Sequence, residues 1–206
     1  MNFKKKILSV VICAGLTMTC FTGCEEKKYF DIEVDSIGDL LFDPGTTVKN
    51  VKKITGKAEL NKVDDGKTLY TMSGWVKFDD EYIDARGMLR IVFDEKKKFS
   101  NWEIAFIDPA IDDYQYDINE DPLGHDNGYF NLSGDTAPDI LGNMSDEINQ
   151  VVGEPFDYLD QVNSGKIIGL SNRWDCGNEM NLSLCIVGNI SHPHEDELCS
   201  LHYEGE

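Results

Sequence analysis

The chain has 206 residues, with 38 Asp and Glu against 19 Lys and Arg, a formal net charge of −19 at neutral pH. This acidic excess disfavours electrostatic binding to nucleic acid or to anionic lipid headgroups, and it favours basic partners or divalent cations. The composition is that of a globular protein without low-complexity runs, and the length suits one large domain or two small ones.

The first 23 residues have the pattern of an export signal. Three consecutive lysines, Lys4 to Lys6, precede a short apolar run, and small residues follow it. The run is shorter than the roughly 20 apolar residues that span a bilayer. Thr22-Gly23-Cys24 resembles the lipobox of bacterial lipoproteins. That resemblance implies that residues 1–23 are removed and that Cys24 is acylated, anchoring the mature chain in the cell membrane, facing outside the cytoplasm.

The alternative is an ordinary secretory signal in which Cys24 is incidental. Cys20 and Cys13 compete as acylation sites, but bulkier residues precede Cys20, and Cys13 lies inside the apolar run. Removing residues 1–23 leaves 16 basic against 38 acidic residues, a net charge of −22. Residues 24–28 form a short tether.

Short segments recur in the same order at offsets that drift between 94 and 100 residues, as insertions and deletions in loops produce. Several weak matches that keep their order indicate an internal repeat. We therefore expect two tandem repeats, residues 29–107 and 129–206, joined by an acidic linker, residues 108–128. The matches pair Tyr29 with Tyr129, Gly45 with Gly142, Gly56 with Gly153, Trp75 with Trp174 and Met88 with Leu182.

Each repeat contains a helix signal near its start. In the first, hydroxyl residues suited to an N-cap precede an apolar stripe over residues 48–54, and Gly56 ends the helix. In the second, Ser145 is the expected cap, Gly153 ends the helix, and Pro155 prevents its continuation. Both repeats are therefore expected to contribute at least one short helix.

Strand patterns follow each helix. Apolar and polar residues alternate with a period of two, which predicts a sheet with one buried face. The fold class is therefore α+β, each repeat consisting of one or two short helices packed on an antiparallel sheet of three to four strands. The expected strands are residues 70–78, 88–93 and 101–106 in the first repeat and 166–176, 181–188 and 197–203 in the second.

The pattern Gly-x-Thr-x-x-x-Val-x-x-Ile-x-Gly, from Gly45 to Gly56 and again in similar form from Gly142 to Gly153, resembles the unit of two families. These are the β-lactamase inhibitor proteins and the small outer-membrane-assembly lipoproteins. Two tandem copies resemble the inhibitors more. The first repeat lacks the inhibitors' disulfide cysteines, and the linker is longer and more acidic than theirs. The resemblance implies a shared fold, whereas a shared target does not follow from it.

One sheet face is expected to bind a partner. Alternation places Trp75 and Lys77 opposite the helix-facing side chains, with Arg90 and Glu103 nearby, and an exposed Trp beside Arg is typical of an interface hot spot. The alternative is that Trp75 is covered by its own neighbours. By the resemblance, the loop after residue 79 corresponds to the inhibitors' target-binding loop. The predicted partner-binding residues are Trp75, Lys77, Asp80, Glu81, Tyr82, Arg90, Glu103 and Trp174.

The mature chain beyond Cys24 has three cysteines, all in its last 31 residues. A disulfide is permitted outside the cytoplasm, although three cysteines leave one unpaired. We expect Cys185, on the middle strand of the second repeat, to pair with Cys176 or Cys199. Alternation does not decide between these two partners.

No nucleophile motif, phosphate loop or zinc-protease motif is present. Metal-capable residues crowd together from His192 to Cys199, but a polar hairpin loop explains them better. The stretch from Asp108 to Asp126 spaces carboxylates as a calcium loop does, yet Pro122 occupies the position that needs Gly, so a solvated linker is favoured. No metal, cofactor or catalytic residue is therefore expected.

These patterns favour a lipid-anchored protein-binding module outside the cytoplasm that is not an enzyme. Inhibition of an extracytoplasmic enzyme is one form of such binding, and a cell-envelope assembly or scaffold lipoprotein is another. The competing class is a metal-dependent sensor or enzyme that uses the acidic linker and the His192 to Cys199 segment. The partner is expected to be an extracytoplasmic or membrane protein, not nucleic acid.

Overall fold

Strands form in this chain where apolar and polar residues alternate, and helices form where apolar residues recur at helical spacing. The computed structural model describes residues 29–64, 66–79, 84–107, 132, 136–163, 167–189 and 198–205. The helical segments within them are the 3₁₀ helix η1 (Ile37–Leu40) and the α-helices α1 (Val48–Thr55) and α2 (Thr136–Val151). The strands are β1 (Phe30–Val34), β2 (Asn61–Asp64), β3 (Thr68–Asp79), β4 (Asp84–Phe93), β5 (Phe99–Phe106), β6 (Asp157–Asn163), β7 (Ile167–Asp175), β8 (Met180–Asn189) and β9 (Leu198–Gly205).

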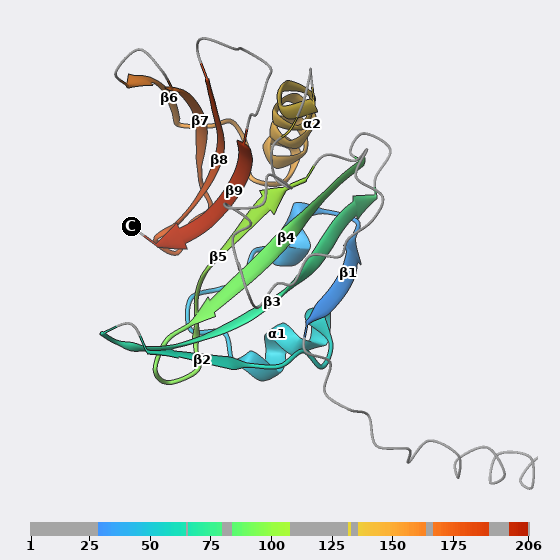
Figure 1. The fold of residues 1–206 in the computed structure, drawn as a ribbon, viewed down its shortest axis with the longest axis vertical. Helices are drawn as coiled ribbons and strands as arrows, with labels where there is room; N and C mark the ends of the chain where they lie inside the picture. The colour runs from blue at the N-terminus through green and yellow to red at the C-terminus, as the bar shows by residue number, and fades with distance from the viewer. Residues whose placement is uncertain are drawn as a thin grey trace, which may run out of the picture.

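The nine strands of the described residues form one sheet, in the order β1-β3-β4-β5-β9-β8-β7-β6, with β2 also paired to β3 (Figure 1). Every pair is antiparallel except β1 with β3, which is parallel. In the middle of the sheet β5 pairs with β9 and joins its two halves. The α+β fold class is confirmed, whereas the expectation of an entirely antiparallel sheet is wrong for β1.

One face of the sheet packs against the helices. Buried residues of η1, α1 and α2, among them Val51 and Ile148, join those of the strands in one continuous core. Buried residues alternate with more exposed ones along β5 and β9, as the geometry of a strand with one buried face requires. We call the helix-packed side the covered face, and the opposite side, which carries Lys77, Glu103 and His202, the outer face.

Local signals set both ends of α1. Thr47 caps the first turn, its hydroxyl accepting a hydrogen bond from the backbone N–H of Asn50 at 3.4 Å. Gly56 ends the helix at a φ of 74°, a conformation that a residue without a side chain adopts at little cost. The predicted helix and its terminating glycine are therefore confirmed.

The helix α2 begins earlier than predicted. Ser145 lies inside the helix instead of capping it, and its hydroxyl accepts a hydrogen bond from Nδ2 of Asn172 at 3.1 Å. The helix starts nine residues upstream, at Thr136, because its apolar stripe extends in that direction. The buried residues of this stripe are Ile140, Met144 and Ile148.

The sequence matches between the two halves agree with the structure in the helices but not in the strands. Val51 and Ile148 are matched at an offset of 97 residues, and both are fully buried. The matched tryptophans differ, because Trp75 lies on the outer face and Trp174 on the covered face. A shift of one residue in a strand moves a side chain to the other face, so this part of the alignment is wrong.

Buried hydrogen bonds attach the helices to the sheet and to each other. Nε1 of Trp174 donates to Oδ1 of Asn149 on α2 at 2.8 Å. The backbone N–H of Ile37 in η1 donates to Oε1 of the buried Glu147 on α2 at 2.6 Å, across 110 residues of sequence. Buried polar groups need such partners, and here the partners lie on different layers of the fold.

The predicted disulfide of Cys185 with Cys176 or Cys199 is wrong, since all three cysteines are free. Cys185 lies on the outer face, directly opposite Ser200 of β9. Cys199 is buried in the core on the covered face, and Cys176 packs against the same core. Side chains that leave a sheet on opposite faces cannot meet to form a disulfide.

Two weakly acidic groups are expected to make the protein less stable at alkaline pH. Burial, with a smaller contribution from Asp175, raises the pKa of Cys176 from 9.0 to about 11, and burial raises the pKa of Tyr203 from 10.0 to about 12. The folded chain keeps these protons at a pH where the unfolded chain has lost them. Their stabilising contribution is therefore complete below pH 9. The contribution of Cys176 is lost as the pH rises from 9 to about 11, and that of Tyr203 as the pH rises from 10 to about 12.

The expected result is a urea unfolding midpoint that falls over this pH range under reducing conditions. The fall should be smaller in Cys176→Ala, which removes one of the two groups. Equal slopes for the wild type and the variant would contradict the contribution of Cys176.

Candidate functional site

A row of polar side chains crosses the outer face from β3 to β7. The strand register pairs Ser73 with Arg90, Arg90 with Glu103, Glu103 with His202, and continues to Ser183 and Arg173. Side chains directly opposite each other on one face of a sheet lie about 5 Å apart and can interact. We call these six residues the central row: Ser73, Arg90, Glu103, His202, Ser183 and Arg173.

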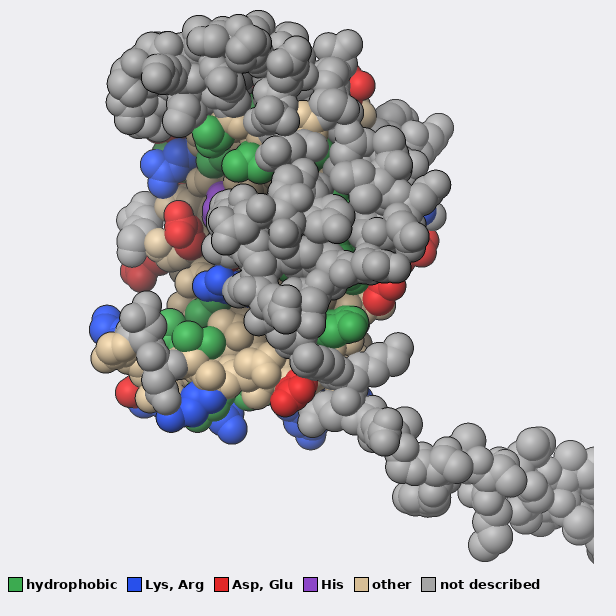
Figure 2. Space-filling view, in the orientation of Figure 1, with side chains coloured by type: hydrophobic (Ala, Val, Ile, Leu, Met, Phe, Trp, Pro, Cys, Tyr) green, Lys and Arg blue, Asp and Glu red, His purple; other side chains and the backbone are tan. Residues whose placement is uncertain are grey.

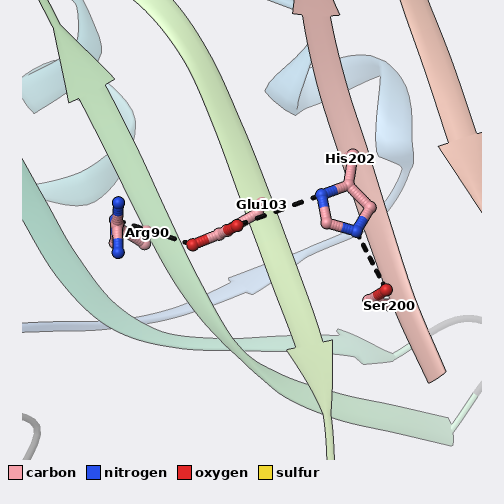
Figure 3. Close-up of polar contacts among 4 residues, drawn as sticks. All are labelled: Arg90, Glu103, Ser200 and His202. Atoms are coloured by element: carbon pink, nitrogen blue, oxygen red, sulfur yellow. Dashed lines mark hydrogen bonds and ion pairs between the residues drawn. The ribbon is translucent and has the colours of Figure 1, made fainter. Parts of the chain in front are cut away.

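Glu103 lies in the middle of the central row and contacts both neighbours (Figure 3). Its Oε1 is 3.5 Å from Nε of Arg90, and its Oε2 is 3.9 Å from Nδ1 of His202. The three side chains are 28–35% exposed, so solvent reaches them only in part. Nε of Arg90 and Oε1 of Glu103 are shielded from solvent, yet neither has a hydrogen-bond partner among the described residues. This ion pair therefore retains hydrogen-bonding capacity.

Ser200 lies two residues before His202 on β9, and its Oγ is 2.9 Å from Nε2 of that histidine (Figure 3). A hydroxyl, an imidazole and a carboxylate in this order are also the parts of a hydrolytic triad. Here, however, Ser200 pairs with Ala105 on one side and Cys185 on the other. The backbone N–H groups around it belong to the sheet ladder, so they are not free to stabilise an oxyanion. The geometry fits polar recognition better than nucleophilic catalysis.

Trp75 lies on the predicted face but is not exposed. Only 8% of its surface is accessible, and it packs with Met88 and Ile107 in a small second hydrophobic cluster. The guanidinium carbon of Arg86 lies 5.3 Å from the centre of its ring, a cation–π contact. The prediction of an exposed tryptophan is therefore wrong, and the arginine beside it is Arg86, whereas Arg90 lies opposite Ser73.

The other predicted partner-binding residues that the structure describes divide into two groups. Lys77, Arg90 and Glu103 lie on the outer face, as alternation predicted. Trp174 is fully buried and bonded to α2, because its strand position points toward the helices. Its assignment to a binding surface is wrong.

Several predicted features lie outside the described residues. They are Cys24 with its signal, the loop residues Asp80, Glu81 and Tyr82, the linker 108–128, and most of the segment from His192 to Cys199. Cys199 itself is buried in the core. Within the part of the chain that the structure describes, no group of three or more His, Cys, Asp and Glu side chains could hold a metal ion.

The sequence reasoning missed residues that the fold brings into the site. His202 looks isolated in the sequence, and nothing there indicates that β9 pairs with β5. Alternation within β9 could have placed Ser200 and His202 on one face, but only the pairing brings them to Glu103. The missed residues are Ser73, Arg86, Arg173, Ser183, Ser200 and His202.

Comparisons of the chain with models of protein families, with curated proteins and with solved structures find no match. Among the described residues, no helix is both long and apolar enough to cross a membrane.

Proposed function

We propose that this chain is a lipid-anchored protein-binding module outside the cytoplasm, which contacts a partner protein through the outer face around the central row. The partner is an extracytoplasmic or membrane protein. Inhibition of an extracytoplasmic enzyme and assembly or scaffolding at the cell envelope are two forms of this activity. The proposal needs no catalytic step, cofactor or metal.

The observation that carries the proposal is the central row itself. The described helices all pack on the covered face, so none of them lies over this row. Arginine is enriched at interfaces because its planar group binds carboxylates and backbone carbonyls, and the row has an arginine near each end, Arg90 and Arg173. Small side chains beside it on the second half, Ser171, Cys185 and Ser200, leave room for a partner's side chains.

The finer proposal for the fold is that residues 29–107 and 129–206 are tandem repeats. The matching burial of α1 and α2 supports it. The strand order supports it as well, since β2-β3-β4-β5 and β6-β7-β8-β9 are each antiparallel neighbours in sequence order, with β5 and β9 meeting in the centre. Two tandem copies of such a unit are what the resemblance to the β-lactamase inhibitor proteins implies. A shared enzyme target does not follow from it.

Site-specific photocrosslinking in living cells tests the proposed surface. A photoreactive amino acid replaces Asn101, a half-buried residue on the outer face beside the central row, or Asn143, an exposed residue on α2. We expect a discrete crosslinked partner from position 101 and none from position 143. Arg90→Gln and Glu103→Gln should each weaken the crosslink by about tenfold, because either change leaves a half-buried charge without its ion-pair partner.

The controls are Lys67→Gln and Glu154→Gln, which remove exposed charges from the connections between β2 and β3 and between α2 and β6, outside the central row, and should leave the crosslink unchanged. Equal crosslinking from positions 101 and 143 would overturn the surface assignment. A discrete partner captured only from position 143 would move the interface to the helical side of the molecule.

A further inference from the structure

Two lysine-bearing segments, far apart in the sequence, lie side by side at one end of the sheet. The backbone N–H of Phe99 donates to the carbonyl of Thr46 at 2.7 Å, and Lys98 forms a β-bridge with Thr47, the cap of α1. The turn between β4 and β5 therefore packs against the first turn of α1. We call five lysines of these segments the lysine patch, the exposed Lys49, Lys53, Lys96 and Lys97 and the half-exposed Lys98.

The turn between β4 and β5 is built so that it presents three consecutive lysines. Oδ1 of Asp94 accepts hydrogen bonds from the backbone N–H groups of Lys96 at 2.9 Å and Lys98 at 2.7 Å. Lys97 adopts a positive φ of 59°, which closes the turn. The carboxylate of Asp94 is thus engaged with the backbone, and Glu95 is the exposed acid of this turn.

The patch has a charge opposite to that of the whole chain. Residues 46–57 contain four lysines and no acid, and residues 94–98 contain three lysines and two acids. Figure 2 shows Lys and Arg side chains along the lower edge of the molecule, where Figure 1 places α1 and the turn between β4 and β5. Ile54 of α1, which is 39% exposed, adds an apolar side chain among these lysines.

The acidic charge is concentrated in the other half of the chain. Residues 25–107 carry 14 Lys and Arg against 17 Asp and Glu, whereas residues 108–206 carry 2 against 21. A molecule with this asymmetry is oriented by a negatively charged surface, which attracts the lysine-rich end and repels the acidic half. The net charge of the whole chain disfavours binding to anionic headgroups, but it does not describe the electrostatic field at the lysine-rich end.

The sheet topology places the lysine patch at the end where the chain enters. β1 runs parallel to β3, so that both strands point away from the first residues of β3. Phe30 pairs with Gly74, and Val34 pairs with Phe78. Phe30 therefore lies level with the middle of β3, and the turn between β4 and β5 lies four residues further back, near the start of β3, where Tyr70 pairs with Phe93. The chain between an acylated Cys24 and Phe30 can reach at most about 20 Å.

We infer that the lysine patch binds the anionic lipid headgroups of the membrane in which the acyl anchor is inserted. This inference rests on the anchor of the proposed function and adds an electrostatic contact that orients the folded module. Each lysine at an anionic surface adds a modest attraction that falls off within a Debye length, so several lysines close to the bilayer act together. Ile54 would enter the headgroup region between them.

Lysine acetylation of the purified lipoprotein tests the inference. The mature chain is reconstituted in vesicles of phosphatidylcholine alone or with about 30% phosphatidylglycerol, and the modification rate of each lysine is measured by mass spectrometry. We expect the patch lysines to react at least about threefold more slowly in the anionic vesicles, and the difference to disappear in about 0.5 M salt. Lys77, on the outer face at the far end of β3, is the internal reference and should not change.

A second variant separates the patch from general membrane proximity. Replacing Lys96, Lys97 and Lys98 by Gln should reduce the protection of Lys49 and Lys53 in the anionic vesicles while the chain remains anchored. Equal acetylation rates in both kinds of vesicle would overturn the inference. Protection of the patch lysines from acetylation that is seen only in native cell envelopes would also overturn the inference. It would indicate that the patch binds an acidic protein.

Flotation of the vesicles tests the acyl anchor separately from the lysine patch. If the mature chain is not acylated and does not float with neutral vesicles, the anchor of the proposed function fails. The lysine comparison is then repeated with the unanchored chain. Protection in anionic vesicles alone would still support the patch, and its absence would overturn it.

Discussion

Replacing Trp174 with Ala is expected to destabilise the protein by about 3–5 kcal/mol, which is a large fraction of the stability of a typical domain. The indole is fully buried between the sheet and α2, and its Nε1 donates to Oδ1 of Asn149 at 2.8 Å. The smaller side chain leaves a cavity and removes the donor that satisfies Asn149. Urea denaturation followed by circular dichroism measures the change.

Trp174→Phe is the matched control for this prediction. It keeps most of the aromatic volume and loses the hydrogen bond, so its cost should be well below that of Trp174→Ala. An alanine variant that is as stable as the wild type and fails to bind its partner would place Trp174 on the binding surface after all. That result would contradict its position in the core.

The parts of the fold that follow from short segments of sequence were predictable. The N-cap at Thr47 and the positive φ at Gly56 are local effects, and the chain near them contains all the residues that produce them. Alternation likewise located β3, β4, β5, β7, β8 and β9, and it placed Arg90 and Glu103 on one face. The strands β1, β2 and β6, of four to seven residues, were missed. β2 and β6 have mixed polarity, whereas β1 alternates strictly but over only five residues.

The features that depend on pairing between distant segments were not predictable. Nothing in either strand specifies that β5 pairs with β9, so the contact of Glu103 with His202 has no signal in the sequence. An alternating pattern also does not show which face of a strand is buried when apolar residues occur on both faces. Trp75 and Trp174 show the consequence, because matching them in sequence placed them on the same face, whereas the structure places them on opposite faces.

Replacing Cys24 with Ala is expected to release the protein from the membrane or to leave it as an uncleaved precursor. Each buried methylene of an acyl chain contributes about 0.8 kcal/mol, and stable anchoring requires two chains or a chain with a basic patch. A lipoprotein cysteine carries at least two chains. The lysine patch alone, on a mature chain with a net charge of −22, would not replace them once salt screens it. Fractionation of cells followed by a high-salt wash of the membranes measures the loss.

Cys20→Ala is the matched control, since it removes the nearest competing cysteine and should leave the protein in the membrane fraction. Release by Cys20→Ala and retention by Cys24→Ala would move the acylation site to Cys20. If Cys24→Ala is processed and fractionates like the wild type, the anchor is wrong. The short tether would then no longer hold the starting end of β3 near the bilayer, and the lysine patch would have to bind an anionic membrane by its charge alone.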